Sequence, residues 1–229
     1  MTSTTPRTAI VTGSASGIGA AVAAALEKDG YTVAGLDIHP AAPYVVDVSD
    51  PAAVDQTVAR VVAEHGPVDA VVSAAGHYEM VPISKITRQQ LHRMLCVHLG
   101  GLRNVTRCVL PSMLGRGAGS IIAITSELAI GGGDGDAHYA AAKGAIIGLV
   151  RSLAVEVACR GVRVNAVAPG PTDTPLLAAD SPWRAPEYLA TVPNRRLTRP
   201  DEIAEVVSFL LNTDFCVGEV LSPNGGAVI

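Results

Sequence analysis

A glycine-rich turn lies near the start of the chain, between an apolar strand predicted over residues 8–11 and an alanine-rich helix predicted over 18–29. The turn reads Thr-Gly-Ser-Ala-Ser-Gly-Ile-Gly, with glycines at positions 13, 17 and 19. Glycines let the backbone turn tightly and approach a pyrophosphate, and the helix N-terminus offers N–H groups and the positive end of its dipole. Strand, turn and helix in this order form the context of a dinucleotide-binding unit, although a glycine-rich turn without a ligand is the alternative.

A carboxylate ends the second predicted strand, over residues 32–37. Asp37 lies 24 residues after Gly13, close to the ~20 residues expected for the acid that binds the adenosine ribose. A carboxylate at this place accepts hydrogen bonds from the ribose hydroxyls and repels a 2′-phosphate. No Lys or Arg stands beside it at positions 14, 15, 38 or 39. The sequence therefore favours NAD, with NADP as the less favoured cofactor.

Two reactive side chains stand four residues apart in the helix predicted over 138–160. Tyr139 and Lys143 share one face of this helix, because positions i and i+4 are neighbours on a helix surface. A free tyrosine has a pKa of about 10, and an adjacent ammonium is expected to lower that pKa toward the range of a general acid or base. Taken alone, the pair has an alternative interpretation as a solvated helix face.

Strand and helix signals alternate along the whole chain. Strands are predicted near 8–11, 32–37, 44–47, 69–73, 119–124, 162–167 and 219–221, and helices near 18–29, 51–65, 87–114, 138–160 and 200–211. Charged residues make up only 17% of the chain, against ~25% in typical domains, which suits strands buried on both faces. The pattern predicts an α/β fold: a Rossmann-like, doubly wound parallel sheet of about seven strands with helices on both faces. No linker divides it, so residues 1–229 are expected to form a single domain.

Two connections depart from this regular alternation. Only about six residues separate Asp37 from Tyr44, whereas a parallel crossover usually contains a helix. The helix between the second and third strands is therefore predicted to be shortened or absent. The segment 171–199 contains five prolines together with Trp183 and Tyr188, and a long insertion of this kind is usually a lid or a disordered segment. We predict a lid, in which Trp183 either packs against the core or contacts a substrate.

The bulk composition excludes several functional classes. A formal net charge of −4 gives no basic surface for nucleic acid, and no segment has the ~20 apolar residues of a membrane span. Residues 1–7 are polar and lack the apolar core of a signal peptide. The four cysteines, at 96, 108, 159 and 216, lack the spacing of metal ligands and are expected to be free thiols in a reducing compartment. We therefore expect a soluble cytoplasmic protein with no metal site and no contact with nucleic acid or membrane.

Taken together, these features resemble the short-chain dehydrogenase/reductase family in its compact single-domain form, over nearly the whole chain. The matching elements are the turn Thr12–Gly19, Asp37, Asp47-Val48, Ala75-Gly76, Ser126, Tyr139 with Lys143, Asn165, and Pro169-Gly170 followed by Thr174. Ser126 lies 13 residues before Tyr139, which is the spacing of the family's serine and tyrosine. The joint match is far more specific than any one element. It implies an NAD(H)-dependent enzyme that interconverts a small secondary alcohol and a ketone.

The resemblance also implies a role for each matched residue. Tyr139 would be the general acid/base, Lys143 would hold the nicotinamide ribose and lower the pKa of the tyrosine, and Ser126 would orient the substrate oxygen. The residues implied to bind the cofactor, besides Tyr139 and Lys143, are Gly13, Ser16, Gly17, Ile18, Gly19, Asp37, Asp47, Val48, Ala75, Gly76, Pro169, Gly170, Thr172 and Thr174. Taken locally, the hydroxyl of Ser126 could instead cap the end of a strand, and positions 172 and 174 could cap a loop.

The chain departs from the family pattern at two places. The family usually has an asparagine in the central helix that holds a water in a proton relay to the lysine, and here the matching position is His98. Because the reference pKa of histidine is about 6.5, His98 is expected to take part in the relay, and a histidine satisfied within the helix packing is the alternative. The second departure is the segment 73–76, Ser-Ala-Ala-Gly, which lacks the family's pair of asparagines. This change is expected to alter stability rather than activity.

The substrate is only coarsely indicated. The polar and apolar side chains expected to flank the site are His77, Tyr78, Glu127, Leu128 and His138. Arginines at 184, 195 and 196 either pair with an anionic substrate or lie on the surface. A 3-oxoacyl-carrier-protein-type ketoreductase and a cyclic dihydrodiol dehydrogenase are alternative functions, and an NAD-binding sensor or scaffold is the non-enzymatic alternative. The resemblance further implies a homotetramer, or a homodimer, built through the helices near 87–114 and 138–160.

Overall fold

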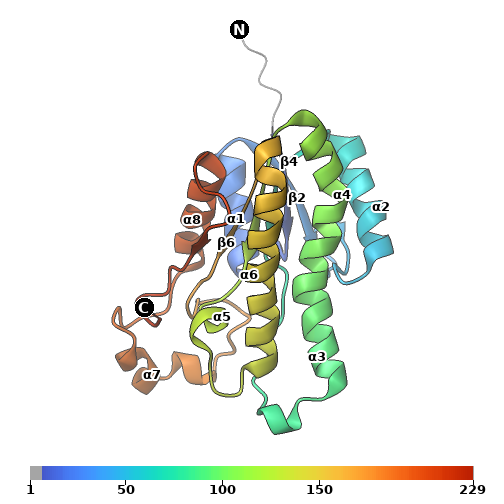
Figure 1. Cartoon of the computed structure of the whole chain (residues 1–229). Coiled ribbons are helices and arrows are strands. Elements are labelled where there is room, and N and C mark those ends of the chain that lie inside the picture. The colour runs from blue at the N-terminus through green and yellow to red at the C-terminus, as the bar shows by residue number, and fades with distance from the viewer. Residues whose placement is uncertain (1–6, 229) are drawn as a thin grey trace.

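The computed structural model describes residues 7–228 of the chain (Figure 1). Residues 1–6, on which part of the argument against a signal peptide depends, and Ile229 lie outside the described residues. The strands are β1 (Arg7–Thr12), β2 (Tyr31–Asp37), β3 (Tyr44–Val45), β4 (Val68–Ser73), β5 (Gly119–Ile124), β6 (Val162–Val167) and β7 (Val220–Leu221). They form one parallel sheet in the order β3-β2-β1-β4-β5-β6-β7. The predicted doubly wound α/β fold is confirmed.

Helices cover both faces of this sheet (Figure 1). They are α1 (Gly17–Lys28), α2 (Pro51–His65), α3 (Arg88–Leu95), α4 (Gly101–Arg116), α5 (Leu128–Gly131), α6 (Ala137–Val157), α7 (Pro186–Thr191) and α8 (Pro200–Asn212). Successive residues of a strand point to opposite faces. In β1, Ala9 and Val11 therefore pack with α1 and α8, whereas Ile10 packs with the layer of α2, α4 and α6. None of the helices in residues 7–228 has the length and apolar character of a membrane span.

The strand order reverses beside β1. The chain runs from β1 through α1 to β2 on one side of β1, and β4 pairs with its other side and leads on to β5. In open parallel sheets, ligands bind outside the carboxyl ends of the strands at such a reversal. The fold therefore directs the loops after β1, β4, β5 and β6 toward one common site.

The two unusual connections are both present. No helix lies between β2 and β3, where residues 38–43 form bends and turns, so the predicted loss of that helix is confirmed. β3 is shorter than the predicted strand 44–47 because only two of its residues pair with β2. The lid segment 171–199 is less irregular than predicted, since it contains a 3₁₀ turn at Pro182–Arg184 and the short helix α7.

The helix predicted over 87–114 contains a feature that its sequence does not reveal. α3 begins with a capping box, in which the Gln90 N–H donates to Thr87 Oγ1 at 3.2 Å and the Thr87 N–H donates to Gln90 Oε1 at 3.0 Å. A π-helical turn, Cys96–Gly100, then joins α3 to α4. Such turns are frequent at functional sites, and this one carries His98.

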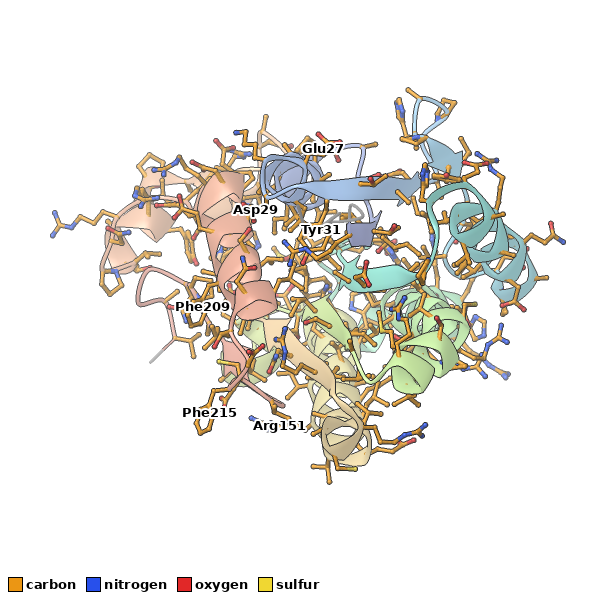
Figure 2. All side chains as sticks on the ribbon, turned by 90° about the horizontal axis from the view of Figure 1, so that it is seen from above. Glu27, Asp29, Tyr31, Arg151, Phe209 and Phe215 are labelled. Carbon is orange, nitrogen blue, oxygen red and sulfur yellow. The ribbon has the colours of Figure 1, made fainter. Side chains whose placement is uncertain are left out.

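Apolar side chains are exposed at one edge of the molecule. In the view from above, Phe209 on α8 and Phe215 after it point outward (Figure 2). Phe209 is 55% exposed, Phe215 is 98% exposed, and Val155 near the end of α6 is 83% exposed. Exposed apolar groups of this size are typical of contact surfaces when they lie together.

Candidate active site

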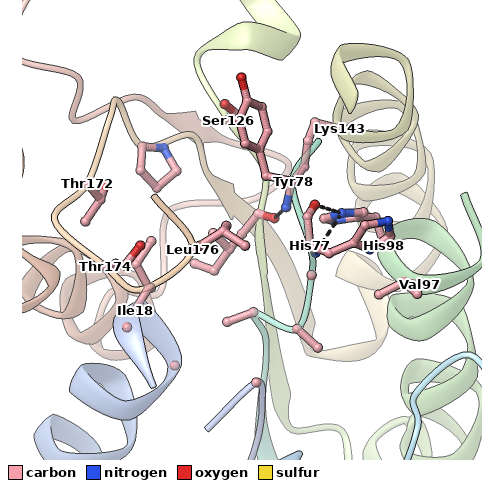
Figure 3. A pocket seen from close by; sticks show the side chains of 18 of the residues that line it. Ile18, His77, Tyr78, Val97, His98, Ser126, Lys143, Thr172, Thr174 and Leu176 are labelled. Atoms are coloured by element: carbon pink, nitrogen blue, oxygen red, sulfur yellow. Dashed lines mark hydrogen bonds between the residues drawn. The ribbon is translucent and has the colours of Figure 1, made fainter. Parts of the chain in front are cut away.

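A cavity of about 720 Å³ opens at the carboxyl ends of the strands (Figure 3). Its walls come from the turn after β1, the ends of β2 and β3, the loops after β4, β5 and β6, the π-helical turn and α6. The lining includes all the residues that the sequence predicts for catalysis or cofactor binding: Gly13, Ser16, Gly17, Ile18, Gly19, Asp37, Asp47, Val48, Ala75, Gly76, His98, Ser126, Tyr139, Lys143, Pro169, Gly170, Thr172 and Thr174. Segments far apart in the sequence thus meet in one concave site.

The glycine-rich turn packs too closely for any side chain. Gly13 has a φ of +70°, and a Cβ added there would lie 2.8 Å from the Cα of Ala75. A Cβ on Gly19 would lie 2.0 Å from the carbonyl oxygen of Gly13. Ser16, the residue before α1, makes no side-chain cap to the helix, so side chains leave the first N–H groups of α1 free for an anion. The turn thus has the shape and the donors that a dinucleotide pyrophosphate needs.

Asp37 is held in place by the backbone at the end of β2. Its Oδ2 accepts a hydrogen bond from the Ala15 N–H at 3.0 Å, and its Oδ1 accepts one from the His39 N–H at 2.9 Å. Among the described residues it forms no ion pair. A fixed, unneutralised carboxylate at this wall suits hydroxyl donors and opposes a phosphate.

Asp47 has a structural partner as well as a place in the cavity wall. Its Oδ1 accepts hydrogen bonds from the Ser49 N–H at 2.8 Å and the Ser49 hydroxyl at 2.7 Å. This carboxylate therefore braces the turn that leads into α2. Val48 beside it is buried and packs against Gly101, where an added Cβ would lie 2.7 Å from a Val48 methyl group.

Three of the four predicted catalytic side chains come from two neighbouring elements. Tyr139 and Lys143 project from one face of α6, and Ser126 follows β5; all three are buried. The Lys143 Nζ donates to the carbonyl oxygen of Ile124 at 2.8 Å and lies 5.6 Å from the centre of the Tyr139 ring. The Thr125 hydroxyl donates to the Lys143 carbonyl oxygen at 2.8 Å. Hydrogen bonds from the end of β5 thus fix α6 and its lysine.

The expected lowering of the Tyr139 pKa by Lys143 is wrong for this structure. Burial, followed by the negative charge of Glu127, raises the pKa of the Tyr139 phenol above its usual value. Burial also lowers the pKa of Lys143 to about 7, so its ammonium is only partly protonated near neutral pH. Desolvation therefore outweighs the i, i+4 proximity of the two groups. An ionised Tyr139 needs a further positive charge in the cavity.

His98 is buried beneath the site and packed from several sides. Its Nε2 lies 2.8 Å from the carbonyl oxygen of His77 (Figure 3). Its ring stands edge-on to Tyr139, with the ring centres 5.5 Å apart. A Cβ on Gly76 would lie 2.4 Å from this ring. Burial, aided by the charge of Lys143, holds the pKa of His98 well below its usual range. His98 therefore does not have the ordinary histidine pKa that the sequence suggests, because burial disfavours its charged form.

The lid is attached to the cavity by a chain of hydrogen bonds that the sequence analysis missed. The Trp183 Nε1–H donates to the Tyr78 hydroxyl at 2.9 Å, and that hydroxyl donates to Asp136 Oδ1 at 2.7 Å. Tyr188 packs edge-on against Trp183, with ring centres 4.8 Å apart. Trp183 lines the cavity and also fastens the lid, so both roles considered for it are compatible. The only sequence signal for Asp136 is its position just before the first residue of α6.

One residue expected to flank the site, and two of the arginines in or after the lid, have other surroundings. His138 is buried outside the cavity lining. Arg184 pairs with Asp173 at 2.7 Å, and Arg196 pairs with Glu202 at 2.6 Å. The interpretation of these two arginines as structural or surface residues is therefore the better one. The cations that do line the cavity, among the described residues, are Lys143 and Arg93.

Comparison with known proteins agrees with this geometry. Residues 13–228 match a family model described as enoyl-(acyl carrier protein) reductase. The chain is 34% identical to the 3-oxoacyl-[acyl-carrier-protein] reductase FabG of Thermotoga maritima, covering 96% of this chain and 97% of the relative. It is 36% identical to a cis-4-hydroxycyclohexanecarboxylate dehydrogenase of Sinomonas cyclohexanicum, covering 96% of each. An aldohexose dehydrogenase structure from Thermoplasma acidophilum superposes with a TM-score of 0.89 and 30% identity, covering 96% of this chain and 93% of that one.

These matches run through the glycine-rich turn, the sheet and the Ser126, Tyr139 and Lys143 site rather than through one part of the fold. They confirm that the chain is an enzyme rather than a non-catalytic sensor or scaffold. The chain belongs to the short-chain dehydrogenase/reductase family, whose members are oxidoreductases that act on alcohol or keto groups with a nicotinamide cofactor.

Proposed function

We propose that this enzyme interconverts a small secondary alcohol and the corresponding ketone with NAD(H). The observation that carries the proposal is the arrangement of one cavity, with the Gly13–Gly19 turn and Asp37 at one end and Ser126, Tyr139 and Lys143 at the other. When bound, the nicotinamide accepts or supplies the hydride, and the protein supplies orientation and the proton path.

NAD is favoured over NADP by the fixed carboxylate of Asp37. Both of its oxygens are oriented by backbone N–H groups, and no described cation pairs with it. A 2′-phosphate at that wall would meet an uncompensated negative charge, whereas ribose hydroxyls would donate to it. Around the rest of the cavity, we assign Ser16, Gly17, Ile18, Asp47 and Val48 to the adenosine and pyrophosphate side.

The remaining lining residues are assigned to the nicotinamide side: Ala75, Gly76, Pro169, Gly170, Thr172 and Thr174. Thr172 also caps its own loop, since its hydroxyl donates to the Gly170 carbonyl oxygen at 2.8 Å. A Cβ on Gly170 would lie 2.8 Å from the Cα of Asn224, so the close packing of this loop on the C-terminal segment determines its path.

Tyr139 transfers the proton in this scheme, and Ser126 holds the substrate oxygen. Because burial raises its pKa, the Tyr139 phenol is protonated in this structure. In the proposed complex, the positive charge of the oxidised nicotinamide ring and of a protonated Lys143 would lower that pKa. His98 acts as a neutral group: it positions the His77 carbonyl and supports the Tyr139 ring.

We further propose that the chain works as one catalytic domain, with residues 171–199 as the lid, in the cytoplasm. A homotetramer, or a homodimer, is the proposed assembly, and the exposed Phe209, Phe215 and Val155 support it because they leave apolar area uncovered in the single chain.

A second candidate is reduction of a 3-oxoacyl thioester. The names of the relatives support it, since they include 3-oxoacyl-[acyl-carrier-protein] reductases and acetoacetyl-CoA reductases. A third relative acts on a hydroxylated cyclohexane carboxylate, which supports a cyclic alcohol. The turnover assay should therefore test acetoacetyl-CoA, 4-oxocyclohexanecarboxylate and uncharged cyclic ketones, each with NADH and with NADPH. Turnover of 4-oxocyclohexanecarboxylate or of an uncharged cyclic ketone with NADH supports the proposal. Turnover of acetoacetyl-CoA with NADPH alone would replace it by the second candidate.

A further inference from the structure

Glu127 is a buried carboxyl group next to the serine of the site. It follows Ser126 directly, lines the cavity and is only 5% exposed. No described cation pairs with it. A carboxyl group this deeply buried normally requires a partner or a function, and the catalytic scheme above assigns it neither.

The proton of the Ser126 hydroxyl is directed at Glu127. The Ser126 Oγ donates to Glu127 Oε2 at 3.0 Å, and the same Oγ accepts a hydrogen bond from the Leu128 N–H at 3.2 Å. A serine hydroxyl has one proton to donate and two lone pairs to accept with. While this hydrogen bond persists, Ser126 has no proton left with which to stabilise the oxygen of a bound ketone.

The groups that face Glu127 offer no compensating positive charge. Asp136, at the start of α6, raises the pKa of Glu127, and the charge of Glu127 in turn raises the pKa of Tyr78, Tyr139 and Tyr188. Lys143 is bonded to the Ile124 carbonyl oxygen instead. Burial is the main cause that raises the pKa of Glu127 to about 7, and hydrogen bonds from the Ser126 hydroxyl and from the backbone of Glu127 and Leu128 oppose this rise.

We propose that Glu127 is a positioning residue that controls, through its own protonation, whether Ser126 can donate to the substrate oxygen. When Glu127 is ionised, it accepts the serine proton. When it is protonated, its O–H donates to the free lone pair of Oγ, and the serine proton turns to the substrate. Glu127 exchanges its proton with solvent in the cavity that it lines; apart from that O–H bond, only hydrogen bonds change. The inference depends on the proposed oxidoreductase function for its catalytic consequence.

The coupling between the two side chains can be measured without turnover. Carbon-13 NMR of glutamate-labelled protein should contain one carboxyl resonance that titrates about two or more pH units above an ordinary glutamate. Glu127→Gln should remove this resonance, and the exposed control Glu27→Gln should retain it. Ser126→Ala should raise its pKa, because the carboxylate loses its hydrogen bond. Absence of such a resonance, or a pKa unchanged in Ser126→Ala, would overturn the proposal.

The pH profile of ketone reduction tests the catalytic consequence. In the wild type, kcat/KM should fall as pH rises through the pKa of Glu127. In Glu127→Gln, whose amide donates to Ser126 at every pH, the part of this fall that is due to Glu127 should disappear, and only the part due to deprotonation of Lys143, whose pKa is also about 7, should remain. The variant should therefore be up to about tenfold faster than the wild type near pH 8. Retention of the same fall in Glu127→Gln would overturn the proposal even if the NMR coupling is present. Lack of turnover in the wild type with every ketone and both cofactors would instead overturn the proposed function.

Discussion

The two ends of the cavity are built in different ways. At the cofactor end, backbone atoms make the shape: Gly13 and Gly19 touch neighbouring backbone, and Asp37 is held by two N–H groups. At the substrate end, side chains make the shape, through hydrogen bonds from Ser126 to Glu127 and from Trp183 to Tyr78. The first end is determined by local chain geometry and the second by packing between distant segments. Substitutions at the first end should therefore act mainly on cofactor binding and stability, whereas substitutions at the second end should act mainly on turnover.

The largest effect should come from the substrate end. Tyr139→Phe removes only the hydroxyl from a buried ring, and loss of a general acid typically lowers kcat by about 10²–10⁴. NADH binding, measured by calorimetry, should change little, because the ring itself remains. Retention of more than a tenth of the wild-type kcat would show that Tyr139 is not the proton donor.

At the cofactor end, the matched test is Gly19→Ala. The added Cβ would fall 2.0 Å from the Gly13 carbonyl oxygen, so the turn must open. We expect NADH binding to weaken beyond about 100-fold and stability to fall by a few kcal/mol. Gly115→Ala is the control, since nothing lies within 4 Å of its added Cβ. Normal NADH affinity in Gly19→Ala would refute a backbone-built pyrophosphate site.

Burial of Lys143 should lower the free energy of unfolding, although the proposed catalysis requires this lysine. Because the pKa of Lys143 is lowered to about 7 in the folded protein from its usual 10.5, the unfolded chain binds more protons between these values. Stability should therefore rise with pH across that window. Lys143→Met should be inactive and yet more stable than the wild type, by a few kcal/mol near neutral pH. The difference, followed by denaturant unfolding, should shrink as pH approaches 10.5; a difference independent of pH would contradict the lowered pKa.

A smaller effect is expected when the hydrogen bonds that hold the lid are removed. Tyr78→Phe removes the acceptor for Trp183 and the donor to Asp136. Loss of these bonds should raise KM by roughly tenfold, with less change in kcat, and hydrogen exchange should quicken over residues 171–199. An unchanged exchange rate there would mean that the lid is held by other contacts.

The smallest effect should come from a position outside both ends. Thr87→Ala breaks the capping box of α3 and should lower stability by about 1 kcal/mol. Catalysis should not change, since the cap lies outside the cavity lining. A marked fall in kcat would show that α3 transmits strain to His98.

The sequence predicts the cofactor end better than the substrate end, for a physical reason. Local motifs, such as the turn 12–19 and the carboxylate after β2, determine their own geometry through backbone contacts. The missing helix before β3 also follows from a segment length, because the six residues between Asp37 and Tyr44 are too few for a crossover helix. Every residue that is predicted to be catalytic or to bind the cofactor lies in the cavity wall.

The substrate end depends on quantities that spacing does not encode. The direction of the Ser126 proton, the hydrogen bond from Trp183 to Tyr78 and the π-helical turn at His98 arise from contacts between β5, α6, α4 and the lid. The i, i+4 spacing of Tyr139 and Lys143 correctly predicts that both groups lie on one face of α6. The same spacing predicts the wrong sign for the pKa shift of Tyr139, because desolvation becomes known only with burial.

The most direct test of the account is calorimetric titration of NADH and NADPH into the wild type and into Asp37→Ala. We predict tight binding of NADH to the wild type, much weaker binding of NADPH, and a loss of roughly tenfold or more in NADH affinity in Asp37→Ala. Preference of the wild type for NADPH would contradict the role of Asp37. Failure to bind either cofactor would contradict the assignment of the cavity itself.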